Sequence, residues 1–130
     1  MQYYAHISDD KVRKQTVKEH LTGTARLSGL FAEAFRCGEW GYGCGILHDI
    51  GKYSQGFRKR LEGGSMIDHA TAGAREMMRL YARSNPLAAY CTAYCISGHH
   101  SGLLDGGRTG DTAGEATLQG RLKKQLEDYS

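Results

Sequence analysis

The chain has 130 residues, of which 40% are hydrophobic and 24% are charged. This composition is that of an ordinary globular protein, and we expect residues 1–130 to form a single domain. The net charge of +3 is compatible with a nucleic-acid partner but too small to indicate one. No run approaches the roughly 20 apolar residues of a membrane span, and the start lacks a secretory signal pattern. We therefore expect a cytoplasmic protein with no membrane partner.

Apolar residues at three- and four-residue spacing predict a mainly helical chain. The first helix is expected over residues 11–36, with Asp9 or Asp10 as its cap. Its apolar stripe includes Val17, Leu21, Leu27, Leu30, Phe31 and Phe35. A second helix is expected over 39–53 despite the alternating glycines at 41, 43 and 45, because a helix tolerates glycine where another backbone packs closely.

Three further helices complete the predicted fold. Ser84-Asn85-Pro86 ends a helix over 68–83 and opens the next, because Asn caps well and Pro suits the first helical position. That next helix, over 87–97, is nearly all small or apolar and is expected in the core. A glycine-rich loop over 98–114 leads to a last helix over 115–129. The predicted fold class is all-α, a compact helical bundle.

The four cysteines contain no C-x-x-C pair, which gives little support to a zinc site made of thiolates. Cys91 and Cys95 lie four residues apart and share one helix face. We expect them to behave as small buried hydrophobic residues. The histidines are more informative than the thiols.

Five histidines and one aspartate form the constellation that carries chemistry. They lie on or directly after different predicted helices: His20, the pair His48-Asp49, His69 and the pair His99-His100. Imidazole together with carboxylate suits divalent transition metals. Because neighbours on a helix point about 100° apart, His48 can bind one ion while Asp49 bridges to a second. The set is too large for one four-coordinate zinc but fits two ions roughly 3.5–4 Å apart.

The order of the motifs is more specific than any one of them. The stretches that carry it are Tyr4-Ala5-His6-Ile7-Ser8, Glu19-His20-Leu21, Leu47-His48-Asp49-Ile50-Gly51-Lys52-Tyr53-Ser54-Gln55-Gly56-Phe57, Asp68-His69-Ala70-Thr71-Ala72-Gly73-Ala74 and Ile96-Ser97-Gly98-His99-His100-Ser101-Gly102-Leu103. In this order they resemble the HD superfamily of metal-dependent phosphohydrolases, and most closely the HD nuclease domain of the type I CRISPR helicase–nuclease. The resemblance spans nearly the whole chain, and His6 is expected outside the metal site.

The resemblance implies an HD-type helical domain that holds two divalent ions and cuts single-stranded DNA in CRISPR interference, an antiviral defence. The ions would be Mn²⁺, Ni²⁺, Co²⁺ or Fe²⁺, with Mg²⁺ sometimes sufficient. The first ion would be bound by His20, His48 and Asp49, and the second by Asp49, His69, His99 and His100. Asp49 and Lys52 are the expected catalytic residues, with the Lys52 ammonium meeting a phosphate or orienting the water between the ions.

The resemblance also implies partners and an incomplete site. No phosphate-binding Gly-x-x-x-x-Gly-Lys-Ser/Thr motif occurs, so the CRISPR helicase would act in trans or from a removed continuation, beside a CRISPR effector complex. The family site takes one more aspartate beyond the histidine pair, and no later aspartate here has the expected surroundings. We therefore expect either a C-terminally truncated chain or a minimal version, whose first ion binds more weakly than its second.

Two basic clusters are candidates for DNA contact: Arg58-Lys59-Arg60, and Arg121 with Lys123 and Lys124. Either cluster suits a phosphate backbone, but each is more typical of a solvated helix surface. The residues that bind nucleic acid are therefore left open.

Two other functions also remain open. An HD-type nucleotidase or cyclic-nucleotide phosphodiesterase would use the same ligands but would need an enclosed pocket that recognises a base. A degenerate, non-catalytic metal-binding module would keep the fold and act only as an interaction partner. Assays of single-stranded DNA beside a panel of nucleotides separate all three.

Overall fold

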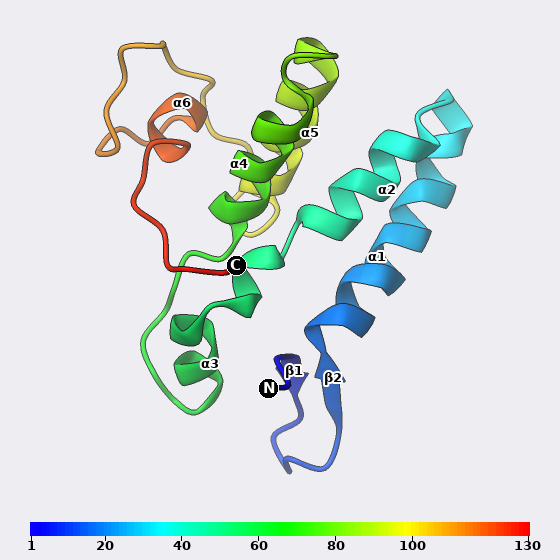
Figure 1. Cartoon of the computed structure of the whole chain (residues 1–130), viewed down its shortest axis with the longest axis vertical. Helices are drawn as coiled ribbons and strands as arrows, with labels where there is room; N and C mark the ends of the chain where they lie inside the picture. The colour runs from blue at the N-terminus through cyan, green and yellow to red at the C-terminus, as the bar shows by residue number, and fades with distance from the viewer.

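The computed structural model describes residues 1–130 and is mainly helical (Figure 1). Its elements are β1 (Tyr4–Ile7), β2 (Lys14–Thr16), α1 (Val17–Ala32), α2 (Gly38–Leu47), α3 (Gln55–Leu61), α4 (Ala70–Tyr81), α5 (Pro86–Gly98) and α6 (Leu118–Arg121). Two 3₁₀ helices, η1 (Glu33–Phe35) and η2 (Ile50–Tyr53), follow α1 and α2. None of the helices combines the length and the apolar composition that crossing a membrane requires.

Two helical hairpins organise the chain. Helix α1 packs against α2, and α4 packs against α5, each pair running in opposite directions (Figure 1). A small core lies within the α4–α5 hairpin, formed by Ala74, Met77, Ala93 and Ile96. Trp40, Cys44 and Leu47 of α2 pack against this core. The packing brings the last turns of α2 and α5 next to the first turn of α4.

The helix predicted over 87–97 is confirmed, and the helix predicted over 39–53 is confirmed as far as Leu47, after which residues 48–53 form a turn and the 3₁₀ helix η2. The side chain of Asn85 accepts a hydrogen bond from the Ala88 N–H at 3.2 Å, and Pro86 occupies the first turn of α5. Helix α2 forms despite its glycines because α1 approaches it closely. A Cβ atom at Gly41 would lie 2.4 Å from the backbone oxygen of Ser28.

The start of the first helix differs from the prediction. Residues 14–16 pair with β1 in a two-stranded antiparallel sheet, so the helix begins at Val17 and the chain is not purely α. Neither Asp9 nor Asp10 caps it. The Thr16 hydroxyl accepts a hydrogen bond from the Glu19 N–H at 3.1 Å, and the Glu19 carboxylate accepts one from the Thr16 N–H at 2.9 Å. This reciprocal capping box fixes the true start of α1.

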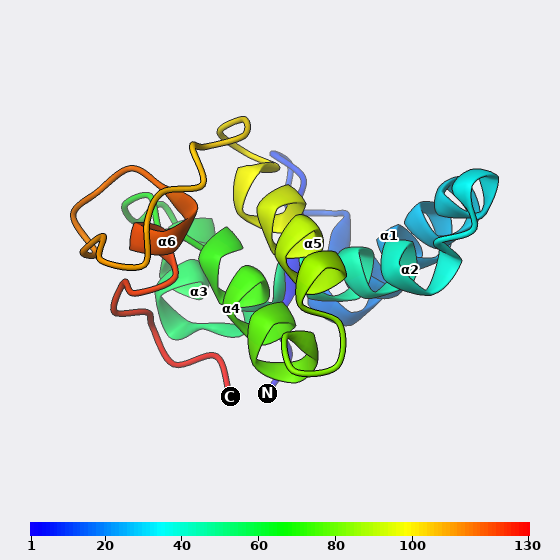
Figure 2. The same cartoon turned by 90° about the horizontal axis from the view of Figure 1, so that it is seen from above.

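Part of the predicted apolar stripe of α1 lies on the surface. The far end of the α1–α2 hairpin projects away from the other helices (Figure 2). Val17 and Leu21, near the start of α1, are buried. The apolar side chains toward the far end are exposed: Leu27, Leu30, Phe31 and Phe35. Only the near half of the hairpin therefore has a core to pack against.

The cysteines line one groove between the α1–α2 hairpin and α5: Cys37, Cys44, Cys91 and Cys95. Cys91 and Cys95 are exposed, so the expectation that they are buried is wrong. Helix α5 buries the face that meets α4, which includes Ala89, Ala93 and Ile96, and leaves its thiol face uncovered.

The predicted helix over 115–129 is wrong except for one turn, α6. That turn begins where the Thr117 hydroxyl accepts a hydrogen bond from the Gly120 N–H at 3.1 Å. In a continuing helix, the carbonyl of Leu122 would accept from the N–H four residues later. Instead the Arg75 side chain of α4 donates to that carbonyl at 3.1 Å and also to the carbonyl of Lys124. This tertiary contact takes the place of the helical hydrogen bonds.

Candidate metal centre

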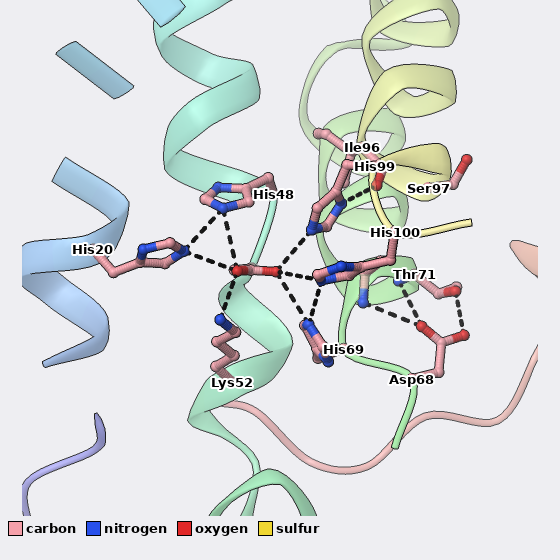
Figure 3. A network of polar contacts seen from close by, with 12 residues as sticks. His20, His48, Lys52, Asp68, His69, Thr71, Ile96, Ser97, His99 and His100 are labelled. Atoms are coloured by element: carbon pink, nitrogen blue, oxygen red, sulfur yellow. Dashed lines mark hydrogen bonds and ion pairs between the residues drawn. The ribbon is translucent and has the colours of Figure 1, made fainter. Parts of the chain in front are cut away.

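All six residues predicted to bind metal lie at or near helix ends, where the two hairpins meet. They are His20 near the start of α1, His48 at the end of α2, Asp49 before η2, His69 at the start of α4, His99 at the end of α5, and the following His100. Figure 3 shows the five imidazole rings pointing toward one another from these separate elements. The structure gathers all six into one cluster.

One oxygen of the Asp49 carboxylate faces α1, α2 and η2. Asp49 Oδ2 lies 2.9 Å from His20 Nε2 and 3.2 Å from His48 Nε2. The Nε2 atoms of His20 and His48 are themselves 3.1 Å apart. The ammonium of Lys52 lies 2.9 Å from the same Oδ2. We call His20, His48 and Asp49 the first ligand group.

The other oxygen of Asp49 faces α4 and α5. Asp49 Oδ1 lies 3.0 Å from His99 Nε2, 3.4 Å from His69 Nε2 and 3.8 Å from His100 Nε2. The Nε2 atoms of His69 and His100 are 2.7 Å apart. We call Asp49, His69, His99 and His100 the second ligand group. The carboxylate of Asp49, whose side chain is 3% exposed, is thus shared by both groups.

Backbone carbonyls set the tautomer of three of the rings. Nδ1 of His48 lies 2.6 Å from Gly45 O, Nδ1 of His99 lies 2.6 Å from Ile96 O, and Nδ1 of His69 lies 3.2 Å from Ile67 O. Since a carbonyl only accepts, each Nδ1 carries the proton and donates. In the neutral ring, Nε2 then presents a lone pair to the centre of the cluster, which is how imidazole binds a metal ion.

The charge states also suit a cation. Burial alone would raise the pKa of the Asp49 carboxyl, but its close contacts with the imidazoles of His20, His48 and His99 and with the Lys52 ammonium outweigh burial and hold that pKa well below its usual range. Burial lowers the pKa of His69 to about 4, against the opposing charge of Asp49. An ionised carboxylate beside a neutral imidazole is the state that binds metal, and both are present at neutral pH.

Lys52 lies deeper in the site than the sequence led us to expect. Its ammonium sits against Asp49 and 5.3 Å from the centroid of the Phe57 ring, and its side chain is 4% exposed. The i, i+3 spacing across the start of η2 brings Lys52 back onto the carboxylate of Asp49. Its contact is therefore with Asp49, whose negative charge it balances.

Gly51 allows η2 to lie directly against the start of α4. A Cβ atom at this position would be 2.4 Å from the backbone oxygen of His69 and 2.7 Å from its Cα. No side chain fits in that space. The glycine of the His-Asp-Ile-Gly-Lys motif thus sets the distance between Asp49 and His69, which lie on the two sides of this contact.

His6 is the one histidine that the sequence set apart, yet it lies beside the cluster. The centroid of its ring is 4.8 Å from that of His20, with the two planes at 76°. It belongs to neither ligand group. No helical spacing links His6 to the others. Only the pairing of β1 with β2, which the sequence analysis did not predict, brings it to the start of α1.

Comparison with known proteins gives this chain no family. No protein-family model matches it, and no curated protein matches it. The distinctive feature of the cluster is its set of ligand atoms. A buried, ionised carboxylate lies between two sets of imidazole nitrogens. Such a set can hold a metal ion.

Proposed function

We propose that this chain is a metal-dependent phosphodiester hydrolase of the HD type that cleaves single-stranded DNA with the help of two divalent cations. The observation that carries the proposal is that the two carboxylate oxygens of Asp49 face different ligand groups. Asp49 presents Oδ2 to the first ligand group and Oδ1 to the second. A carboxylate that faces two sets of imidazoles suits a pair of ions better than a single ion.

Each residue has a part in holding such a pair. The first ligand group would hold one cation and the second ligand group the other, with Asp49 shared. Two cations bound there would make a water acidic enough to attack phosphorus and would stabilise charge on the phosphate oxygens. The carbonyl partners of His48, His69 and His99 keep their Nε2 atoms directed inward. Lys52 acts as a positioning residue that orients the carboxylate of Asp49.

The donor set also favours particular metals. Five imidazole nitrogens and one carboxylate suit Mn²⁺, Fe²⁺, Co²⁺ or Ni²⁺, whereas Mg²⁺ prefers oxygen ligands. We therefore expect activity with the transition metals to exceed activity with Mg²⁺.

The surroundings of the cluster support a polymer substrate over a free nucleotide. The cavity beside the second ligand group has no aromatic residue in its lining other than the ligands His69 and His100. A pocket that is specific for a nucleotide commonly stacks the base on an aromatic side chain. Together with the motif order of the sequence, this favours nuclease action in CRISPR interference, with a helicase that delivers single strands and an effector complex as partners.

The test is cleavage of circular single-stranded DNA by chelator-treated protein to which one metal is returned at a time. We expect cleavage with Mn²⁺, Ni²⁺, Co²⁺ or Fe²⁺, no cleavage without metal, and none by Asp49→Asn. His6→Ala is the matched control, because His6 touches the cluster without belonging to a ligand group. Phosphate release from nucleotides without DNA cleavage, or metal binding without either activity, would overturn the proposal.

A further inference from the structure

A cavity of about 400 Å³ opens beside the second ligand group and is lined by His69 and His100. Two arginines also line it, Arg60 of α3 and Arg121 of α6. They come from the two basic clusters that lie far apart in the sequence. Each cluster sends a single member into the cavity. The fold thus places two separate positive charges next to the candidate metal centre.

Arg121 is held rigidly in the wall of this cavity. Its Nε donates to Thr71 Oγ1 at 2.9 Å and its Nη1 donates to the carbonyl of Ser97 at 2.6 Å. Asp68 accepts from the Thr71 hydroxyl at 2.6 Å and lies 3.6 Å from Arg121 Nε (the contact between Asp68 and Thr71 is drawn in Figure 3). The side chain of Arg121 is only 16% exposed. These contacts leave Nη2 without a partner, so it can donate to a ligand.

Arg60 differs from its neighbours on α3. Arg58 and Lys59 are exposed and do not line the cavity, and Arg58 donates to the sulfur of Met1. Arg60 is half-buried and lines the cavity, and its side chain makes no hydrogen bond or ion pair within the chain. The guanidinium group is a rigid fork of donors that matches the oxygens of a phosphate. An unpaired arginine in a cavity wall therefore indicates an anionic ligand.

The acidic residue of the cavity does not cancel these charges. The carboxylate of Asp68 accepts hydrogen bonds from the backbone N–H groups of Ala70 and Thr71, both at 3.1 Å, and from the Thr71 hydroxyl. Lys124 Nζ also lies 3.6 Å from it. Asp68 therefore caps the start of α4 and holds the side chain of Arg121 in place. The net charge of the side chains that line the cavity remains positive.

We propose that a single strand of nucleic acid crosses the second ligand group through this cavity, where Arg60 and Arg121 bind the phosphates next to the one that is cleaved. The assignment rests on the proposed function, because it takes the phosphate at the metal centre as the scissile one. Arg60 and Arg121 are positioning residues. They contact the neighbouring phosphates of a polymer. A substrate with a single phosphodiester group has no neighbouring phosphate for them to contact.

The first test is binding without cleavage. Chelator-treated protein is titrated into a fluorescein-labelled oligodeoxynucleotide and followed by fluorescence anisotropy at several salt concentrations. Arg60→Gln should weaken binding roughly tenfold, as expected for the loss of a charged hydrogen-bonded contact. It should also lower the slope of log affinity against log salt by about 0.7, one phosphate contact on a single strand. Arg58→Gln, from the same basic run but outside the cavity, should bind like the wild type.

The second test compares two substrates of the metal-loaded protein. Arg60→Gln should lower kcat/KM on the oligodeoxynucleotide through KM and leave hydrolysis of bis(4-nitrophenyl) phosphate unchanged. Arg121→Lys keeps the charge but not the fork that Thr71 and Ser97 hold, and it should show the same selective loss. A urea unfolding curve confirms that each variant is folded.

The outcomes separate this inference from the proposed function. Equal binding by Arg60→Gln and Arg58→Gln would overturn the nucleic-acid site, whatever the protein cleaves. Equal losses on both substrates would also overturn it, because they would place Arg60 at the scissile group or in the fold. Weaker binding by Arg60→Gln, together with a wild type that cleaves neither substrate, would overturn the proposed function and support the site.

Discussion

Lys52 and Asp49 form a buried ion pair in which Nζ lies 2.9 Å from Oδ2 and the side chains are 4% and 3% exposed. The same Oδ2 faces the Nε2 atoms of His20 and His48. A cation bound by the first ligand group therefore shares one carboxylate oxygen with an ammonium group. The ammonium and the cation compete for that oxygen.

Lys52→Met should consequently strengthen metal binding at the first ligand group. A like charge about 4 Å away costs a few kcal/mol in a protein environment, so we expect a gain of roughly tenfold or more in affinity. The same variant should cleave DNA more slowly, because Asp49 loses the contact that orients it. Isothermal titration calorimetry with Mn²⁺ measures the metal affinity, and a single-turnover assay measures the rate of cleavage. Weaker metal binding by Lys52→Met would show that the two cations do not compete.

Asp49→Asn should remove metal binding and cleavage while the helical content is retained. The amide leaves the buried ammonium of Lys52 without an anionic partner, so the chelator-treated variant should lose about 3–5 kcal/mol of unfolding free energy. Urea denaturation followed by circular dichroism measures the loss. The double variant with Lys52→Met removes both charges and should recover most of the stability without metal binding. A single variant as stable as the wild type would contradict the structural role of the pair.

The candidate site could be predicted from the sequence because its residues are marked by type and by order. Imidazoles that follow separate helices, with an adjacent aspartate, indicate a shared centre whatever the detailed path of the chain. The approach of His6 to His20 and the burial of Lys52 could not be predicted in this way. Both depend on how β1 and η2 pack, which local spacing does not specify.

The two ligand groups should differ in affinity. The second ligand group offers three imidazoles and Asp49 Oδ1, whereas the first offers two imidazoles and an oxygen already paired with Lys52. Stepwise titration with Mn²⁺ should therefore show a tight site and a weaker one. His100→Ala should weaken the tight site and His48→Ala the weak one, and His6→Ala should change neither. Two sites of equal affinity would be inconsistent with this geometry.

Gly51→Ala should weaken the second ligand group although it changes no ligand. The added Cβ has no room against the backbone of His69 and pushes that residue away from Asp49. We expect metal affinity there to fall roughly 10–100-fold, as for other residues that orient metal ligands. The matched control is Gly23→Ala in α1, where nothing lies within 4 Å of the new atom. That change should stabilise the protein by about 0.5–1 kcal/mol and leave metal binding intact.

The ring of His69 should titrate well below that of His99 in chelator-treated protein. Its pKa is lowered from 6.5 to about 4 by burial, whereas the hydrogen bond to Asp49 outweighs burial at His99 and raises the pKa of that residue. Since unfolded His69 binds a proton more readily than the folded form, its contribution to stability falls as the pH drops from about 6.5 toward 4. Proton–carbon NMR of the imidazole rings measures each pKa. A His69 that titrates at or above 6.5 would contradict its burial.

The two ends of the chain show where local patterns fail. Thr16 and Glu19 have the spacing of a capping box in the sequence, but the apolar spacing from residue 11 onward predicts an earlier start of the helix. The helix expected over 115–129 has suitable spacing, and the side chain of Arg75 nevertheless takes the carbonyls that it would need. Similarly, Phe31 and Phe35 have the spacing of core residues but lie where no second element covers them. In the last two cases a tertiary contact, or its absence, decided the outcome.

Anomalous diffraction from crystals grown with Mn²⁺ or Ni²⁺ tests most directly whether two cations share Asp49. We predict two anomalous peaks, one between Oδ2 and the imidazoles of His20 and His48, the other between Oδ1 and the imidazoles of His69, His99 and His100. A single peak, or peaks elsewhere on the molecule, would contradict the account.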